Sequence, residues 1–428
     1  MILIIFGLIG QLAWSVENMY FNVFVFKSIA PDLDAITLMV QLSGVMATVA
    51  TLIAGALSDK VGNRRRFIAY GYAIWGVTVA LFGYISPALM VNVFGVSPEQ
   101  SVAVALVAVI VGDCVMTLFG STANDACFNA WVTDNTKSSF RGTVEGVLAI
   151  LPLVAMLLVV GGFGIILEMV DQNYAVVFLG LGIIISLCGI LGIFIIKDSD
   201  RLEKNGTFRD IFYGFRPSVV KDNKSLYAAL LIVLVYGIAC QIFMPYLVIY
   251  MEKFLGFTAI EYSVVFGGSI ALGAVINVFL GRYSDKKDKT QLLYVAASIM
   301  AAGLFAMYFS RGLVFFGLAG FVMITGYIFV SALTGAIVRD NTPPESAGKL
   351  QGVRMVFSVL IPMIIGPMIG NAINKAMDVP IQDAGEIAMT TEYLPAPEIF
   401  LAGGITACLV IVCVWLLSRA DKKRKENV

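Results

Sequence analysis

The sequence of 428 residues contains no histidine, and charged residues make up only 14% of it. Without histidine, chemistry that depends on an imidazole base or an imidazole metal ligand is excluded. The six cysteines all fall within apolar runs and show none of the paired spacings that bind metals. Neither a metal site nor structural disulfides are therefore expected.

Nucleotide-binding signals are missing as well. The chain has no Gly-x-x-x-x-Gly-Lys-Ser/Thr motif, and no polar segment is long enough to fold as a soluble nucleotide-binding domain. The sequence therefore indicates neither an enzyme nor an ATP-driven pump. No cofactor and no nucleic-acid partner is expected.

Apolar sequence is what the chain has in abundance. Hydrophobic residues make up 59% of it, against about 45–50% in a soluble domain. A membrane-spanning helix needs about 20 apolar residues. We therefore predict an all-α membrane protein of twelve transmembrane helices in a lipid bilayer. The runs lie near residues 2–26, 35–57, 67–86, 101–131, 143–166, 175–196, 225–250, 260–281, 291–309, 313–337, 349–372 and 398–418.

The distribution of positive charge predicts the topology. Alternate loops together with the tail hold 24 of the 29 Lys and Arg residues, which by the positive-inside rule places both termini in the cytoplasm. A monomer in the cell membrane is expected. The expected parts are six-helix halves at 1–196 and 225–418, a polar linker at 197–224 and a basic tail at 419–428.

Phenylalanine and isoleucine recur at helical spacing within the polar linker. They are Phe208, Ile211, Phe212 and Phe215. This pattern favours a short amphipathic helix at the membrane surface. An irregular tether is the alternative.

A repeated loop organises the chain. Gly-Ala-Leu-Ser-Asp-Lys at 55–60 is followed by Val-Gly-Asn-Arg-Arg-Arg, and Gly-Arg-Tyr-Ser-Asp-Lys recurs at 281–286. Val-Thr-Asp-Asn-Thr at 132–136 likewise matches Val-Arg-Asp-Asn-Thr at 338–342. Two parallel, pseudo-symmetric halves are a transporter architecture with the solute site near the midplane between them.

These motifs make the chain resemble the major facilitator superfamily over essentially its whole length. The Asn-Arg-Arg-Arg-Phe ending at 63–67 and the Asp-Asn-Thr blocks look like the glycoside-pentoside-hexuronide:cation symporters and their sucrose-transporter relatives. Sodium-coupled melibiose permeases carry carboxylates in the second span, and residues 35–57 contain none. That departure puts a sodium site of their type in doubt.

The resemblance implies a gating role for the loop carboxylates. It predicts that Asp59 docks on the start of the eleventh span near 348–349, where the positive end of a helix stabilises an anion. By symmetry, Asp285 would dock near Arg141. The alternative for the arginines is an anchor to lipid headgroups. The gating candidates are Gly55, Asp59, Arg64, Arg65, Asp134, Arg141, Glu145, Asp285, Asp340 and Arg354.

Polar residues within the first and fourth spans suggest an aqueous cavity, because charges in a membrane are costly and usually functional. Candidates for solute binding are Gln11, Trp14, Glu17, Asn18, Asn124 and Asn129. Candidates for cation coupling are Asp125, Asp113 and Glu17. A carboxylate withdrawn from water binds a proton more tightly unless a cation compensates. Asp125 is preferred for the proton and Glu17 for solute hydroxyls. Alternatively, these side chains satisfy one another between helices, or Asp113 faces an outer vestibule.

The second half offers fewer polar candidates. Tyr236 and Gln241 lie in the seventh span and Tyr327 in the tenth, and aromatic faces with a few amides suit a polyhydroxylated ligand. Tyrosines are also ordinary packing residues in membrane helices. Glycine pairs such as Gly366 and Gly370 indicate close helix contacts instead of a ligand site.

The sequence thus predicts a secondary transporter that moves a small polar solute, sugar-like in character, by alternating access. The coupling ion would be a proton, with sodium as the other option. The alternative is a drug:proton efflux antiporter. Such antiporters carry a Gly-Pro motif in the fifth span, whereas Pro152 lacks a preceding glycine. A transporter-like receptor is a further alternative.

Overall fold

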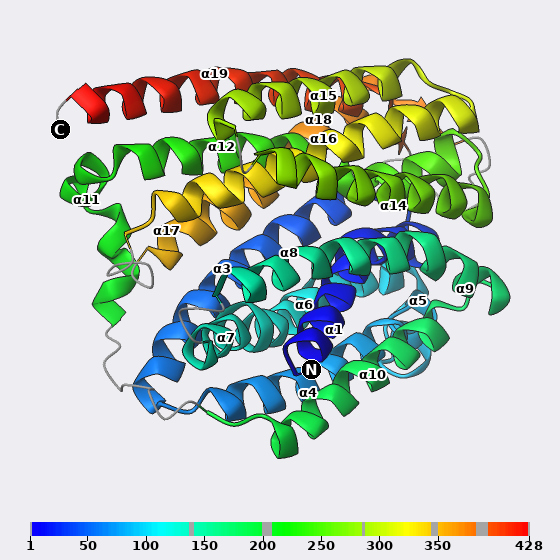
Figure 1. Ribbon diagram of the computed structural model, residues 1–428. Helices are drawn as coiled ribbons and strands as arrows, with labels where there is room; N and C mark the ends of the chain where they lie inside the picture. Colours follow the sequence, from blue (N-terminus) through cyan, green and yellow to red (C-terminus); the bar gives the residue numbers. More distant parts are fainter. Residues whose placement is uncertain are drawn as a thin grey trace. The chain divides into compact units, whose positions relative to one another are not determined.

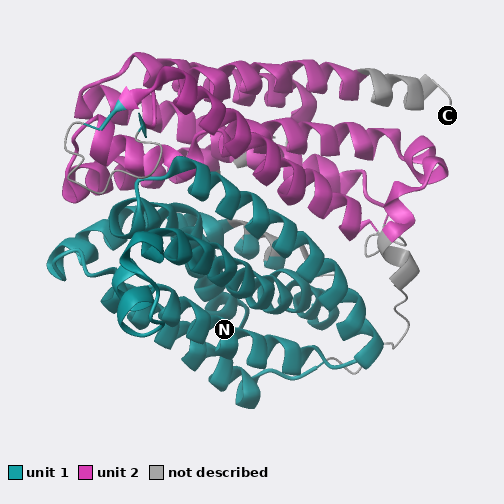
Figure 2. Cartoon of the chain, turned by 180° about the vertical axis from the view of Figure 1, so that it is seen from behind, with its two compact units in different colours: residues 1–208, 380–393 teal, residues 209–379, 394–428 magenta. Residues whose placement is uncertain are grey.

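The computed structural model describes residues 2–136, 141–198, 208–284, 287–343, 350–381 and 393–426. They form two compact units (Figure 2). Unit 1 comprises residues 1–208 with 380–393, and unit 2 comprises residues 209–379 with 394–428.

Unit 1 consists of helices, several of which contain π-helical segments (Figure 1). Its first continuous helical segment comprises α1 (Ile2–Val16), η1 (Glu17–Phe21), α2 (Asn22–Phe24) and η2 (Val25–Ile29). There follow α3 (Leu33–Val61), α4 (Arg64–Phe82), the short α5 (Pro87–Asn92), and a long rod of α6 (Pro98–Gly120), η3 (Ser121–Phe128) and α7 (Asn129–Asn135). The unit closes with α8 (Arg141–Leu158), η5 (Val159–Phe163), α9 (Gly164–Met169) and α10 (Tyr174–Ile195).

Unit 2 repeats this plan. It starts with η6 (Phe208–Phe215), α11 (Pro217–Asp222), α12 (Lys224–Gln241), η7 (Met244–Tyr246), α13 (Leu247–Ile249) and η8 (Tyr250–Phe254). The long helices α14 (Ala259–Ser284), α15 (Lys289–Phe309) and α16 (Leu313–Asp340) come next. It ends with α17 (Gln351–Met355), η10 (Val356–Leu360), α18 (Ile361–Met377), the two-residue strands β1 (Val379–Pro380) and β2 (Tyr393–Leu394), and α19 (Glu398–Glu426).

The predicted all-α membrane fold is confirmed. Within the described residues, eleven helices are long and apolar enough to cross a membrane. A further long helix, α4, has 19 residues and begins with three arginines, at Arg64, Arg65 and Arg66.

Local sequence explains the tight turn between α3 and α4. Gly62 ends α3 with φ 65°, in the left-handed region that glycine adopts without a steric penalty. Asn63 then caps α4, and its side chain accepts a hydrogen bond from the backbone N–H of Arg66 at 3.1 Å. These two residues reverse the chain and place the three arginines in the first turn of α4.

Small residues set the closest helix contacts within each unit. In unit 1, α4 packs along α10, and a Cβ added at Gly76 would lie 2.3 Å from the carbonyl oxygen of Gly182. In unit 2, a Cβ at Gly370 would lie 2.1 Å from the carbonyl oxygen of Ile242, and one at Gly366 would lie 2.4 Å from Gln241 Cβ. The close contacts expected at Gly366 and Gly370 are therefore present between α18 and α12. In the same unit, α15 packs against both α16 and α19 (Figure 1).

The polar linker contains a short helix where one is expected, but it is of the 3-10 type. Phe212 and Phe215 lie in η6 and are 68% and 43% exposed. A 3-10 helix has three residues per turn, so residues three apart, such as Phe212 and Phe215, lie above one another. Residues 199–207 lie outside the described part of the linker.

Candidate functional site

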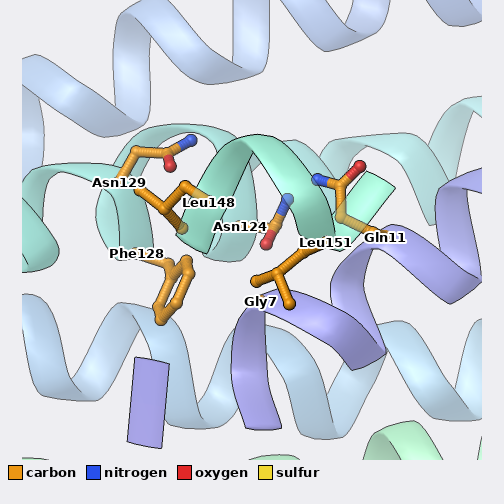
Figure 3. A pocket seen from close by; sticks show the side chains of 7 residues that line it. All are labelled: Gly7, Gln11, Asn124, Phe128, Asn129, Leu148 and Leu151. Carbon is orange, nitrogen blue, oxygen red and sulfur yellow. The ribbon is translucent and has the colours of Figure 1, made fainter. Parts of the chain in front are cut away.

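A pocket opens within unit 1 between α1, η3, α7 and α8 (Figure 3). About 300 Å³ of space free of protein atoms, open solvent included, lies within it. Three amides line it, from Gln11, Asn124 and Asn129, and the sequence argument named all three as solute candidates. Its other lining residues are Gly7, Phe128, Leu148 and Leu151. None of the described residues that line this pocket is charged.

The orientation of the Asn124 amide is fixed by hydrogen bonds on both sides. The Tyr72 hydroxyl lies 2.8 Å from Asn124 Oδ1 and equally close to the carbonyl oxygen of Phe6. Asn124 Nδ2 donates to Asp125 Oδ1 at 3.0 Å, and the Ser121 hydroxyl donates to Asp125 Oδ2 at 3.0 Å. A pocket amide is thus bonded directly to the carboxylate that the sequence favours for proton coupling.

Glycine at position 10 makes this arrangement possible. A Cβ added there would lie 2.4 Å from Asn124 Oδ1 and 2.7 Å from the Tyr72 hydroxyl, closer than real contacts allow. Tyr72 and Gly10 were not among the sequence candidates. Tyr72 lies in a long apolar run, and no spacing rule indicates that its hydroxyl reaches α1 and η3.

The remaining first-span candidates lie in different surroundings. Trp14 packs its ring against Trp75, with the centroids 5.0 Å apart. Asn18 is exposed and donates to the carbonyl oxygen of Trp14 at 2.8 Å. Glu17 does not line the pocket of Figure 3 and is 7% exposed.

A second polar cluster surrounds Glu17. Its Oε1 atom accepts hydrogen bonds from the hydroxyls of Ser43 on α3 and Thr117 on α6, each at 3.1 Å. The two hydroxyl oxygens are themselves 2.9 Å apart. Asp113, one helical turn before Thr117, is 2% exposed. Ser43 was missed by sequence reasoning, because nothing distinguishes its hydroxyl from those of Thr37, Thr48 and Thr51 in the same span.

Both polar clusters involve π-helical segments. Glu17 is the first residue of η1, and Asn124 and Asp125 lie in η3. Such wide turns are rare and often occur at functional sites, because the extra residue redirects side chains that a regular α-helix would place elsewhere. Residues four apart in these segments therefore do not lie on one face, as they would in a regular α-helix.

The repeated loop carries an ion network in unit 1. Arg64 is 7% exposed, and its guanidinium contacts Asp59 at 2.6 Å, Asp134 at 2.5 Å and the Ser58 hydroxyl at 2.9 Å. Sequence reasoning placed Asp59 on the eleventh span, but residues 348–349 lie outside the described part of the chain. The described partner of Asp59 is Arg64.

Arg65 joins a second set of contacts. Its backbone N–H donates to Asp198 at 2.9 Å, and its guanidinium donates to the carbonyl oxygen of Ile193. Lipid headgroups are therefore not needed to explain this arginine. The Gly55 carbonyl accepts from Ser58 at 3.0 Å, and a Cβ at Gly55 would meet nothing within 4 Å.

Unit 2 holds a reduced copy of this network. Lys289 contacts Asp340 at 2.6 Å, and Asp340 occupies the repeat position of Asp134. The two side chains are 34% and 56% exposed, whereas Arg64 is buried. Asp285 lies outside the described residues, as do the side chains of Arg141 and Glu145.

The second-half solute candidates are partly brought together. The rings of Tyr236 and Tyr327 lie 5.5 Å apart between their centroids. Gln241 packs against Gly366. Arg354 is exposed.

Eleven apolar helices among the described residues, a polar pocket and buried carboxylates are features of an integral membrane transporter. The chain belongs to the Major Facilitator Superfamily, whose sequence profile matches residues 3–367. The superfamily membership expected from the repeated loops is confirmed.

Known proteins similar to this chain are transporters. A match of 28% identity over 132 residues links it to the uncharacterized MFS-type transporter YuxJ of Bacillus subtilis (strain 168), covering 29% of this chain and 33% of that protein. The chain therefore matches about a third of this relative's length.

Three solved structures share the fold over nearly the whole chain. They are a variant of the nucleoside transporter NupG (TM-score 0.67, 13% identity, covering 97% of this chain and 98% of that one), a bacterial homologue of the human lysosomal transporter Spinster (0.69, 13%, 98% and 95%) and the xylose transporter XylE from E. coli (0.66, 14%, 97% and 97%).

Proposed function

We propose that this protein is a secondary transporter of an uncharged, polyhydroxylated solute such as a sugar or glycoside. The observation that carries the proposal is the pocket of unit 1, which is lined by three amides and one phenylalanine and by no charged side chain among the described residues. Amides both donate and accept hydrogen bonds, as hydroxyl groups do. An aromatic ring packs against the C–H face of a sugar.

Two further points support the same solute class. The loop motifs resemble those of glycoside-pentoside-hexuronide:cation symporters. The relatives of similar fold include proteins named as nucleoside and xylose transporters, and both of those solutes contain a sugar ring. Within unit 2, the paired rings of Tyr236 and Tyr327 are an aromatic surface of the kind that suits a sugar ring.

Cation coupling is assigned to the carboxylates of unit 1, with Asp125 as the proton site. Asp125 is hydrogen-bonded to Asn124, which lines the pocket. A solute that accepts the hydrogen bond of Asn124 Nδ2 would remove a donor from Asp125. Binding of the solute and binding of the proton would therefore affect each other. We place the protein in the cell membrane with both termini in the cytoplasm.

Counterflow in proteoliposomes tests the proposal. The panel would contain monosaccharides, disaccharides, nucleosides and glycosides, at several pH values and sodium concentrations. Uptake of a labelled sugar-like solute is expected, with loss in Asn124→Ala and none in Asn92→Ala, an exposed asparagine of α5. Proton-driven accumulation of lipophilic drugs, without counterflow of any polyol, would contradict the proposal and favour the efflux alternative.

A further inference from the structure

The cluster around Glu17 differs from the solute pocket in its burial and chemistry. It joins η1, α3 and α6 through Glu17, Ser43, Asp113 and Thr117, which are between 1% and 7% exposed. All side-chain donors are oxygens. The described residues contain no group of three or more Cys, Asp or Glu side chains that could hold a metal ion, so any cation in this cluster would also need the two hydroxyl oxygens.

Positive charge is lacking around this pair of carboxylates. From residue 2 to residue 57 the only Lys or Arg is Lys27, ten positions beyond Glu17, and residues 98–135 contain none. Two carboxylates cannot both stay ionised in an apolar interior without a compensating charge. A bound cation or a proton must therefore neutralise negative charge in the cluster.

Unpartnered oxygens point into the cluster. Glu17 Oε2 and Asp113 Oδ1 are both buried and accept no hydrogen bond from any described residue. An unpartnered buried oxygen costs about 1–3 kcal/mol, and more when charged. Ser43 interacts with Asp113 as well as with Glu17, so the four side chains face one region.

Three oxygen atoms of the cluster lie within hydrogen-bond distance of one another, but the two hydroxyl groups supply only two hydrogens. Glu17 Oε1, Ser43 Oγ and Thr117 Oγ1 form a triangle with sides of 3.1, 3.1 and 2.9 Å. Two hydroxyl hydrogens can bridge only two of these sides. A cation facing the triangle would stabilise the third, because oxygens about 3 Å apart can all lie at about 2.4 Å from one ion.

We propose that Glu17, Asp113, Ser43 and Thr117 form a binding site for one sodium ion, with one of the two carboxyl groups protonated so that the ion balances the charge of the other. An oxygen-only donor set suits a hard cation. Calcium takes six to eight oxygen ligands and magnesium retains several waters, whereas this buried site supplies four side chains. The residues differ from the second-span carboxylates of melibiose permeases, since α3 contributes only a hydroxyl. As a coupling site, the assignment rests on the proposed transport function.

Direct binding to the purified full-length protein tests the site without any solute. Radioactive sodium would be titrated at pH 8 and constant ionic strength, with unlabelled sodium and potassium as competitors. We expect saturable binding of one ion per chain that sodium displaces and potassium does not. Glu17→Gln and Asp113→Asn are expected to abolish it.

Two milder substitutions test the site in case the carboxylate variants fail to fold. Ser43→Ala and Thr117→Val each remove one oxygen and are expected to weaken sodium binding about tenfold. Thr48→Ala is the matched control, because Thr48 lies on α3, is 3% exposed and bonds its own helix at Gly44. Its sodium affinity should equal that of the original protein.

Three results would overturn the assignment. They are the absence of saturable sodium binding in the original protein, full binding in Asp113→Asn, and displacement of sodium by calcium at lower concentrations than sodium itself requires. A response to acid without any sodium binding belongs to the first case and would make the pair a proton site. Sodium binding with no counterflow of any tested solute would count against the proposed solute class and leave the site intact.

Discussion

Asn124 shows how a single side chain can link the pocket to a carboxylate. Its nitrogen donates to Asp125, and its oxygen lies 2.8 Å from the Tyr72 hydroxyl. Rotation of the amide would place its oxygen against Asp125 Oδ1, an acceptor against an acceptor. The geometry presented to a solute is therefore set by residues outside the pocket.

Gly10→Ala tests this dependence. The added methyl group would overlap Asn124 and Tyr72, so we expect solute affinity to fall about tenfold or more, as for a lost hydrogen bond to a polar group. Solute counterflow measures the change. Gly180→Ala in α10 is the control, because a Cβ there meets nothing within 4 Å. Equal solute affinity in the two variants would show that Gly10 does not position Asn124.

Asp125→Asn tests the proton site. The amide cannot exchange a proton in the pH range of transport, yet it keeps an oxygen for Ser121 or Asn124. We expect solute exchange at equilibrium to continue while accumulation driven by a pH gradient is lost. Unchanged accumulation with unchanged pH dependence would make Asp125 a packing residue.

At the scale of elements, the α3–α4 hairpin is held by a buried arginine that bridges two segments far apart in sequence. Arg64 binds Asp59 at the end of α3 and Asp134 at the end of α7. Arginine suits this position because its planar group reaches several acceptors at once. The corresponding pair in unit 2 joins two exposed side chains through a single contact.

Matched substitutions compare the two hairpins. Arg64→Ala leaves two carboxylates without their cation, and we expect a loss of stability of about 2–4 kcal/mol. Lys289→Ala removes an exposed pair and is expected to cost less than about 1 kcal/mol. Thermal unfolding of the purified protein in detergent measures both, as shifts in midpoint. Equal shifts would refute a stabilising role for burial of Arg64.

At the scale of the whole molecule, the buried charged side chains of the described residues lie in one of the two units. Among the described residues, the buried charged side chains are Glu17, Arg64 and Asp113, all in unit 1. The buried polar side chains of unit 2 are serines, threonines and asparagines. The candidate ion-binding groups among the described residues therefore lie in unit 1.

Tyr327→Phe tests that division. Loss of the hydroxyl keeps the ring beside Tyr236, so we expect at most about a tenfold loss of solute affinity and no change in sodium binding or pH dependence. Counterflow and sodium titration on the same preparation provide both measurements. A change in sodium affinity would place ion chemistry in unit 2 as well.

The sequence by itself determined the class of fold and several of the pocket residues. Twelve apolar runs and two copies of a charged loop specify a duplicated membrane protein, since a bilayer admits only helices of sufficient length and charges must remain at their ends. Gln11, Asn124 and Asn129 could be named because polar side chains in such runs are rare. Their convergence on one pocket required the packing of α1 against α8 and η3.

Only the tertiary structure decided which polar groups are neighbours. Tyr72, Ser43 and Gly10 carry no signal in an apolar sequence, and contact depends on helix packing between residues 26 to 100 positions apart. The π-helical turns at Glu17 and across Ser121–Phe128 also change the spacing on which a helical-face argument rests. Hydrogen bonding is short-ranged and directional, whereas hydropathy is a sum over many residues, so the sequence reveals the fold before it reveals the site.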